Sequence, residues 1–265
     1  MASKSIRVGV AAAVLMLAVG GPAVAQDLFG YAGGADSLYT IDPSIPSATL
    51  VGTDGASGIV AEIEHDGSEI WAADTSDNTN LHRINPATGA VLGTITLAFP
   101  SEGNVLTSLE FVDATLYAGL TTEGGGETYL ATVDTGTGAV TTIGPTGAGV
   151  PFGGLAYNGL AMYGISAGGS QATLYTIDLG TGAATAVGSV LVGGSPIGLT
   201  GLEWGTDGVL YAVPNTNEPS AGSLLTIDPE TAAATDLGNT GETSLNALTA
   251  LPWVIPVELM RFEIE

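Results

Sequence analysis

Carboxylates are the only chemically strong side chains that this sequence contains in number. It has 27 Asp and Glu residues, four Lys and Arg, two His and no Cys. Thiol catalysis and cysteine-based zinc clusters are therefore excluded, and Lys4 is the single lysine that a Schiff base or a P-loop could use. The chemistry that remains is the binding of hard cations through oxygen, or hydrolysis by an Asp/Glu pair.

Three glutamates occupy equivalent positions in an internal repeat. An apolar residue recurs at intervals of 46, 46, 47 and 46 residues, at Ile63, Leu109, Leu155, Leu202 and Leu248. The next residue is in turn Glu64, Glu110, Ala156, Glu203 and Thr249. If the repeats surround a common axis, the three carboxylates lie close together, and a cation or protons must then neutralise them. Their oxygens suit Ca²⁺. The alternative is that they lie apart or reach solvent.

The other polar candidates have simpler interpretations. The two histidines, His65 and His82, belong to no recognisable motif with a Ser or Cys nucleophile. The acidic segment 74–80 lacks the spacing of an EF-hand loop, so we interpret it as a solvated connection. The remaining candidates are recurrent tyrosines that follow a strand register and are expected to pack, namely Tyr39, Tyr117, Tyr163, Tyr175 and Tyr211.

The repeat itself predicts β-strands. Its first motif alternates side chains over five residues, at 38–42, 81–85, 130–134, 174–178 and 224–228. A tight turn follows, which ends in Thr-Gly at Gly89, Gly138 and Gly182, and then a second short strand. Between these units lie Asp-Gly or Asn-Gly hairpin turns and a further aromatic-bearing strand. Four strands per unit at a period near 46 indicate the blades of a β-propeller.

The two ends of the repeat region complement each other. Residues 27–31 read as the second strand of a blade that lacks its first strand, and residues 245–251 read as a first strand with no blade after it. Pairing them closes a ring of five blades and leaves no open edge. The sequence therefore predicts an all-β, five-bladed propeller, in which a C-terminal strand completes the N-terminal blade. An open stack of sheets is the alternative, but it would need caps rather than complementary halves.

The repeat resembles those of known propellers. The Leu-Tyr-x-Ile-Asp-x-x-Thr-Gly-x-x-Thr-x-x-Gly unit is similar to repeats of secreted bacterial propeller proteins related to the NHL, YncE-like and SMP-30-like groups. The likeness covers residues 27–251. It indicates propeller blades but does not imply a particular chemical activity. Residues 106–111 with Leu116 and Tyr117 also resemble part of the five-bladed plant-type glutaminyl cyclases. That second likeness implies a functional glutamate at Glu110 alone.

The first 25 residues have the features of a bacterial-type signal peptide. Lys4 and Arg7 precede an apolar run over 8–19, and small residues at 23 and 25 mark a cleavage site. We expect a signal peptide at 1–25, the propeller at 26–252 and a short tail at 253–265. No stretch is long enough for a membrane-spanning helix. The mature chain would keep two basic against 27 acidic residues, a net charge of −25, which disfavours nucleic acid and anionic membranes.

Two functions remain compatible with the sequence. The leading hypothesis is a secreted, extracellular or periplasmic, non-catalytic binding or interaction propeller with a structural cation, calcium, at Glu64, Glu110 and Glu203. Its partner would be an extracellular protein, a glycan or a small molecule. The second hypothesis is a carboxylate-based hydrolase or a glutaminyl-cyclase-like enzyme with its site at one mouth of the channel. A deep pocket with a paired acid and base favours the enzyme, because fold alone does not transfer function.

Overall fold

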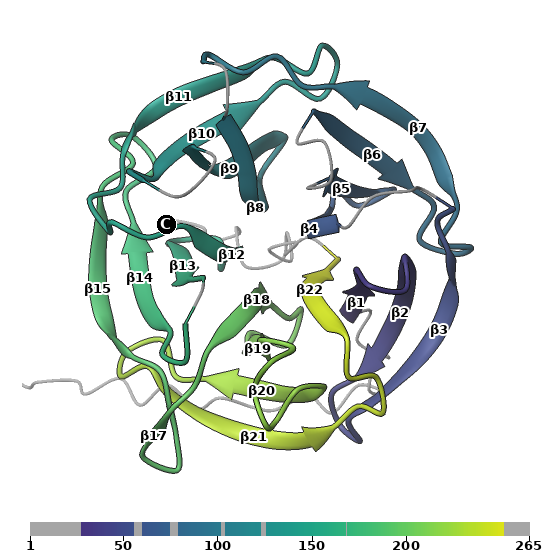
Figure 1. The fold of residues 1–265 in the computed structure, drawn as a ribbon, viewed down its shortest axis with the longest axis vertical. Helices are drawn as coiled ribbons and strands as arrows, with labels where there is room; N and C mark the ends of the chain where they lie inside the picture. Colours follow the sequence, from purple (N-terminus) through teal and green to yellow (C-terminus); the bar gives the residue numbers. More distant parts are fainter. Residues whose placement is uncertain are drawn as a thin grey trace, which may run out of the picture.

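A computed structural model describes residues 28–55, 60–74, 79–101, 104–122, 126–167 and 169–251. All the elements assigned within these ranges are β-strands. They form five sheets arranged radially around one axis (Figure 1). The predicted five-bladed β-propeller is confirmed. In the described ranges no helix could cross a membrane. The expected signal peptide, 1–25, and the expected tail, 253–265, lie outside the described residues.

Each blade runs from an inner strand beside the axis to an outer strand at the rim. The first contains β22 (Leu245–Ala250), β1 (Leu28–Ala32), β2 (Ser37–Asp42) and β3 (Ser47–Thr53). The second contains β4 (Val60–His65), β5 (Ile70–Asp74), β6 (Asn80–Ile84) and β7 (Val91–Thr96). The third contains β8 (Asn104–Val112), β9 (Thr115–Thr122), β10 (Tyr129–Val133) and β11 (Val140–Pro145). The fourth contains β12 (Phe152–Tyr157), β13 (Met162–Ser166), β14 (Thr173–Ile177) and β15 (Ala184–Ser189). The fifth contains β18 (Leu199–Trp204), β19 (Leu210–Pro214), β20 (Ser223–Ile227) and β21 (Ala233–Asn239), extended at its outer edge by the hairpin β16 (Leu191–Val192) and β17 (Ser195–Pro196).

The C-terminal strand closes the ring as the sequence predicts. β22 pairs antiparallel with β1, with Leu28 opposite Ala250 and Gly30 opposite Leu248. The first blade is thus assembled from both ends of the described chain, about 215 residues apart, and its inner strand is supplied last. This pairing removes the open edge that β1 would otherwise present.

A β-bulge recurs in all five inner strands and determines which side chains face the axis. In each one, a single residue is skipped in the pairing with the second strand of its blade, and these residues are Ala61, Thr107, Gly153, Thr200 and Asn246. Two residues later comes the recurring apolar position, which is buried in every blade. Because side chains alternate along a strand, the positions on both sides of that apolar residue face the other way.

At the rim, the Thr-Gly turn of one blade packs on the outer strand of the blade before it. A Cβ atom at Gly182 would lie 2.6 Å from the Gly144 carbonyl oxygen, and Gly182 has a φ of +79°. A Cβ atom at Gly89, which has a φ of +72°, would lie 2.8 Å from the Gly52 carbonyl oxygen of the first blade. Backbone hydrogen bonds add to these contacts, such as Ala184 N to the Thr146 oxygen at 2.9 Å. The repeated Thr-Gly therefore serves contact between blades.

The recurrent tyrosines pack, as expected from their register. Tyr211 is 4% exposed, and the others are partly buried against the apolar clusters between blades.

Candidate metal centre

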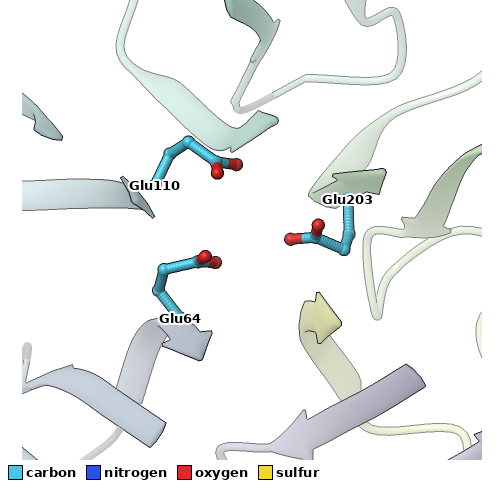
Figure 2. A group of neighbouring side chains, drawn as sticks. All are labelled: Glu64, Glu110 and Glu203. Carbon is cyan, nitrogen blue, oxygen red and sulfur yellow. The ribbon is translucent and has the colours of Figure 1, made fainter. Parts of the chain in front are cut away.

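Three glutamates from three blades converge on the axis. Glu64 comes from β4, Glu110 from β8 and Glu203 from β18, and their carboxyl groups point toward one another (Figure 2). One carboxylate oxygen from each lies within 4.8 Å of those of the other two. The side chains are only 3%, 4% and 5% exposed. They therefore neither lie apart nor reach solvent, and we call these three residues the glutamate triad.

The two other inner strands carry small or neutral side chains at the level of the triad. The equivalent positions of the other two inner strands are Ala156 and Thr249, both fully buried. Ala156 leaves its blade without a polar group at this level, whereas the Thr249 hydroxyl donates a hydrogen bond to Glu64 Oε2 at 3.2 Å. The same hydroxyl accepts from the His65 amide at 2.9 Å, which fixes its direction. Thr249 thus orients one member of the triad from the strand that closes the ring.

Backbone amides also lie near the carboxylates. The Phe111 amide of β8, in the next blade, points at Glu64 Oε1 at 3.5 Å. The Tyr157 amide of β12 opposes the rise in the pKa of Glu110, and the Trp204 amide does the same for Glu203. Even so, Glu110 Oε2 and Glu203 Oε2 are buried and have no hydrogen-bond partner. A buried carboxylate oxygen without a donor is unfavourable, and a cation is one group that would satisfy it.

The electrostatics of the triad favour bound protons or a bound cation. Burial raises the pKa of Glu64 to about 8, although the hydrogen bonds from Phe111 and Thr249 oppose that rise. Burial, and then the charge of Glu64, raise the pKa of Glu110 and of Glu203 well above the usual range. Removal from water disfavours the ionised form of all three carboxyl groups, and nearby like charges add to this effect at Glu110 and Glu203. Arg83, the one Lys or Arg in the described ranges, pairs instead with Glu69 at 2.6 Å.

A fourth carboxylate, which the sequence analysis missed, lies one step further along β4. Glu62 is 1% exposed, and its Oε1 accepts a hydrogen bond from the Ile63 amide at 3.3 Å. Its Oε2 has no partner. The signal was present in the sequence, because Glu62 and Glu64 are two residues apart and two-residue spacing places side chains on one face of a strand.

His65 and Trp204, which directly follow Glu64 and Glu203 in the chain, pack against the preceding blade and help to exclude water from the site. His65 stacks on Phe29 with ring centroids 5.8 Å apart, and Trp204 tilts against Tyr163 at the same distance. His65 is 2% exposed and its Nδ1 accepts a hydrogen bond from the Gly67 amide. This histidine therefore has a packing role beside the triad.

A second acidic group lies between the first two blades. Tyr31 donates a hydrogen bond to Asp54, and His82 lies 3.4 Å from Asp74. Burial, followed by the charges of Asp54 and Asp74, raises the pKa of Asp36. Asp74, the first residue of the acidic segment 74–80, is 8% exposed and so is not solvated as predicted, whereas residues 75–78 lie outside the described residues. These partners were not evident from the sequence, because they come from different strands.

Comparison with solved structures supports the fold. A chain of a nidogen/laminin complex aligns with a TM-score of 0.53 and 14% sequence identity over 87% of each chain. A glutaminyl cyclase from Myxococcus xanthus aligns with a TM-score of 0.48 and 15% identity, over 84% of this chain and 74% of the cyclase. A protein of unknown function from Bacteroides caccae has a TM-score of 0.49 and 10% identity, over 84% and 98%. No protein-family model and no curated protein sequence matches this chain. At such identities the likeness concerns the fold alone.

Proposed function

We propose that this protein is a non-catalytic binding propeller, exported from the cytoplasm, whose central channel holds a calcium ion on the glutamate triad. The observation that carries the proposal is the convergence of three buried carboxylates within 4.8 Å, two of which have an oxygen without a partner. A cation at their centre would satisfy those oxygens and offset the repulsion between the three charges. It would also tie together the second, third and fifth blades.

Calcium fits the donor set better than other common metals. All the donors are hard oxygens, and the site lacks the thiolate and imidazole groups that zinc and copper prefer. Ca²⁺ takes about six to eight oxygen ligands, and three carboxylates that offer both oxygens reach the lower end of that range. Mg²⁺ demands a small, regular octahedron and tends to keep several waters, which a buried site on rigid strands accommodates less well. We therefore expect binding of Ca²⁺ in preference to Mg²⁺.

Burial of the triad also supports a structural role over a catalytic one. The carboxyl groups of a hydrolase or cyclase must touch the substrate, and these three side chains are at most 5% exposed. Glu110, the residue that the cyclase likeness singles out, is 4% exposed. The binding function would instead use the outside of the ring, with an extracellular protein, a glycan or a small molecule as partner. Calcium at extracellular concentrations can load sites with a Kd of about 10⁻⁴ to 10⁻³ M.

The test is a calcium-dependent melting temperature. Ca²⁺ that binds only the folded protein stabilises it by about 2.7 kcal/mol at a hundredfold excess over Kd, which corresponds to a rise of about 5–10 °C for a domain of this size. Chelation should reverse the rise. Glu110→Gln keeps the shape of the side chain but removes one charge and a strong oxygen ligand, so it should abolish most of the calcium response.

Glu230→Gln provides the matched control, because Glu230 is exposed in a rim turn and the substitution removes the same charge. This variant should respond to calcium as the wild type does. In the metal-free protein, Glu110→Gln should be neutral or slightly stabilising, because it relieves repulsion between carboxylates. A wild-type protein whose melting temperature is the same with Ca²⁺ and with chelator contradicts the proposal.

A further inference from the structure

The glutamate triad offers three anionic ligands at a spacing that suits a large cation. Its carboxyl groups come from the inner strands of three blades and point toward one another (Figure 2). One oxygen of each lies within 4.8 Å of those of the other two. Two ligands on opposite sides of an ion lie at twice the metal–oxygen distance, which is about 4.6–5.2 Å for a cation of the size of Ca²⁺. The observed separation falls within that reach.

Neither a lysine nor an arginine compensates the charge of the triad in the part of the chain that the structure describes. Arg83 is the one Lys or Arg in those ranges, and its guanidinium pairs with Glu69. The negative charge of Glu62 acts in the same direction as the triad, because it contributes to the raised pKa of Glu110 and of Glu203. A buried group of like charges favours the cation that brings the most positive charge.

A divalent ion neutralises only two of the three carboxylates. With Ca²⁺ in the site, one negative charge remains among side chains that are 3–5% exposed, and a buried charge without a partner is unfavourable. A trivalent ion neutralises all three carboxylates. It also attracts the two oxygens without a partner, Glu110 Oε2 and Glu203 Oε2, more strongly than a divalent ion does, because Coulomb attraction rises with the charge of the ion.

Lanthanide ions are the trivalent cations that match this site in both size and donor preference. They are hard ions that bind oxygen, as Ca²⁺ does, and their metal–oxygen distances are close to those of Ca²⁺. Fe³⁺ and Al³⁺ are also hard, but they are smaller. The carboxylate oxygens of the triad therefore fit a lanthanide ion as well as they fit calcium, and their charge fits it better.

We propose that the glutamate triad selects trivalent cations of the size of calcium, the lanthanide ions, and binds them at least a hundredfold more tightly than Ca²⁺. This inference rests on the proposed function of the triad as a cation site, and it names the ion that the charge of the site fits best. The physical basis is three buried carboxylates from three blades, with no Lys or Arg beside them in the described ranges. Calcium occupies the site where lanthanides are scarce.

Terbium luminescence measures this binding directly. Trp204 follows Glu203 in the chain. Trp71 lies opposite Glu64 in the pairing of β4 with β5. Light absorbed by these two tryptophans should therefore excite a Tb³⁺ ion bound to the triad. The full chain is stripped with chelator and titrated with Tb³⁺ at moderate salt, which weakens binding to exposed acidic groups.

We expect one emitting Tb³⁺ ion per wild-type chain. La³⁺, which does not emit, should displace it at a comparable concentration, whereas Ca²⁺ should need at least a hundredfold excess. Glu110→Gln keeps the shape of the side chain but removes one anionic ligand, so it should lower the affinity for Tb³⁺ at least a hundredfold. Glu230→Gln should match the wild type, because its carboxylate is exposed on the rim. Thermal melting checks that both variants are folded, and Glu203→Gln replaces Glu110→Gln if that variant is not.

The outcomes separate this inference from the proposed function. Displacement of Tb³⁺ by less than a hundredfold excess of Ca²⁺ overturns the preference for trivalent ions and leaves the calcium site intact. Emission that is unchanged in folded Glu110→Gln also overturns it, because the ion then lies elsewhere. A wild-type protein that binds no Tb³⁺ but is stabilised by Ca²⁺ contradicts this inference alone. A wild-type protein that binds neither ion overturns the proposed function as well.

Discussion

At the scale of the residue, the triad is buried, although ionised carboxylates are stable only when solvated or neutralised. Strand geometry brings three carboxyl groups within 4.8 Å in a buried channel, whereas ionised carboxylates are stable only where water, donors or cations surround them. Backbone amides and Thr249 satisfy part of this need, most completely at Glu64. The protein must hold protons on the triad or bind a cation there. The two states respond oppositely to pH, which makes them distinguishable.

The pH dependence of stability should therefore change with calcium. In the metal-free protein the pKa of Glu64 is raised from 4.5 to about 8, so between those values the folded chain holds more protons than the unfolded chain. Its free energy of unfolding then decreases as pH rises through this window, and each tenfold change in the acid constant corresponds to about 1.4 kcal/mol. Calcium binds the deprotonated triad, so its stabilising effect should grow as pH rises from 5 to 8.

Melting temperatures measured across this pH range, with chelator and with calcium, check the expectation. Glu64→Gln has no proton to lose at this site and should flatten the metal-free profile. A wild-type protein that becomes more stable between pH 5 and 8 in chelator would contradict the assignment of raised pKa values to the triad.

At the scale of the element, the Thr-Gly turn is the part of the repeat that joins blades. Gly182 adopts a left-handed conformation with a φ of +79°, and its Cα faces the Gly144 carbonyl so closely that a methyl group does not fit. The fifth blade departs from the repeat, since Ala232 occupies the same turn position with a φ of +59°. There the neighbour is Gly188, at which an added Cβ atom would lie 3.5 Å from the Ala232 Cβ, an ordinary contact distance. The rim contact in the fifth blade therefore accommodates a side chain that the fourth blade excludes.

Substitutions at these two turn positions should have contrasting effects. Gly182→Ala adds both left-handed backbone strain, about 1–2 kcal/mol, and a clash with backbone that cannot move aside. We expect it to lower stability by about 2 kcal/mol or more, or the melting temperature by about 4–8 °C. Ala232→Gly removes backbone strain from the folded protein but increases the conformational entropy of the unfolded chain. These two effects oppose each other, so the free energy of unfolding should change by less than about 1 kcal/mol. Thermal unfolding of both variants checks this, and equal effects would contradict the proposed role of the turn.

At the scale of the whole molecule, ring closure supplies both the last strand and part of the site. β22 covers the edge of β1 and packs Leu245 and Leu248 against the fifth and first blades. It also carries Thr249, which orients Glu64. Closure and the geometry of the triad are thus coupled, because the hydrogen bond to Glu64 forms only when both ends of the chain meet.

Truncation separates closure from the contribution of the tail. A chain without residues 244–265 lacks β22, so we expect a loss of more than about 10 °C in melting temperature, or aggregation through the exposed edge of β1. The control ends at Leu251, keeps every described strand and should melt within a few degrees of the chain that ends at Glu265. Calcium should stabilise the control and not the longer deletion. If both truncated chains melt like the full one, closure by β22 has no energetic importance.

The number of blades and the strand order were predictable from sequence, because they depend on local periodicity, and the closing strand was predictable because each end of the repeat region carries an incomplete blade. Turns and alternating strands repeat about every 46 residues, and two half-blades can pair in only one way. The candidate triad was also visible, since Glu64, Glu110 and Glu203 follow equivalent apolar residues. Tertiary structure alone decided that these carboxyls are buried and within 4.8 Å, that Glu62 is buried two residues before Glu64, and that Asp74 is buried beside His82. The physical reason is that burial and distance across the axis depend on how closely five blades pack around it. That packing is set by bulges and rim contacts between residues far apart in the chain.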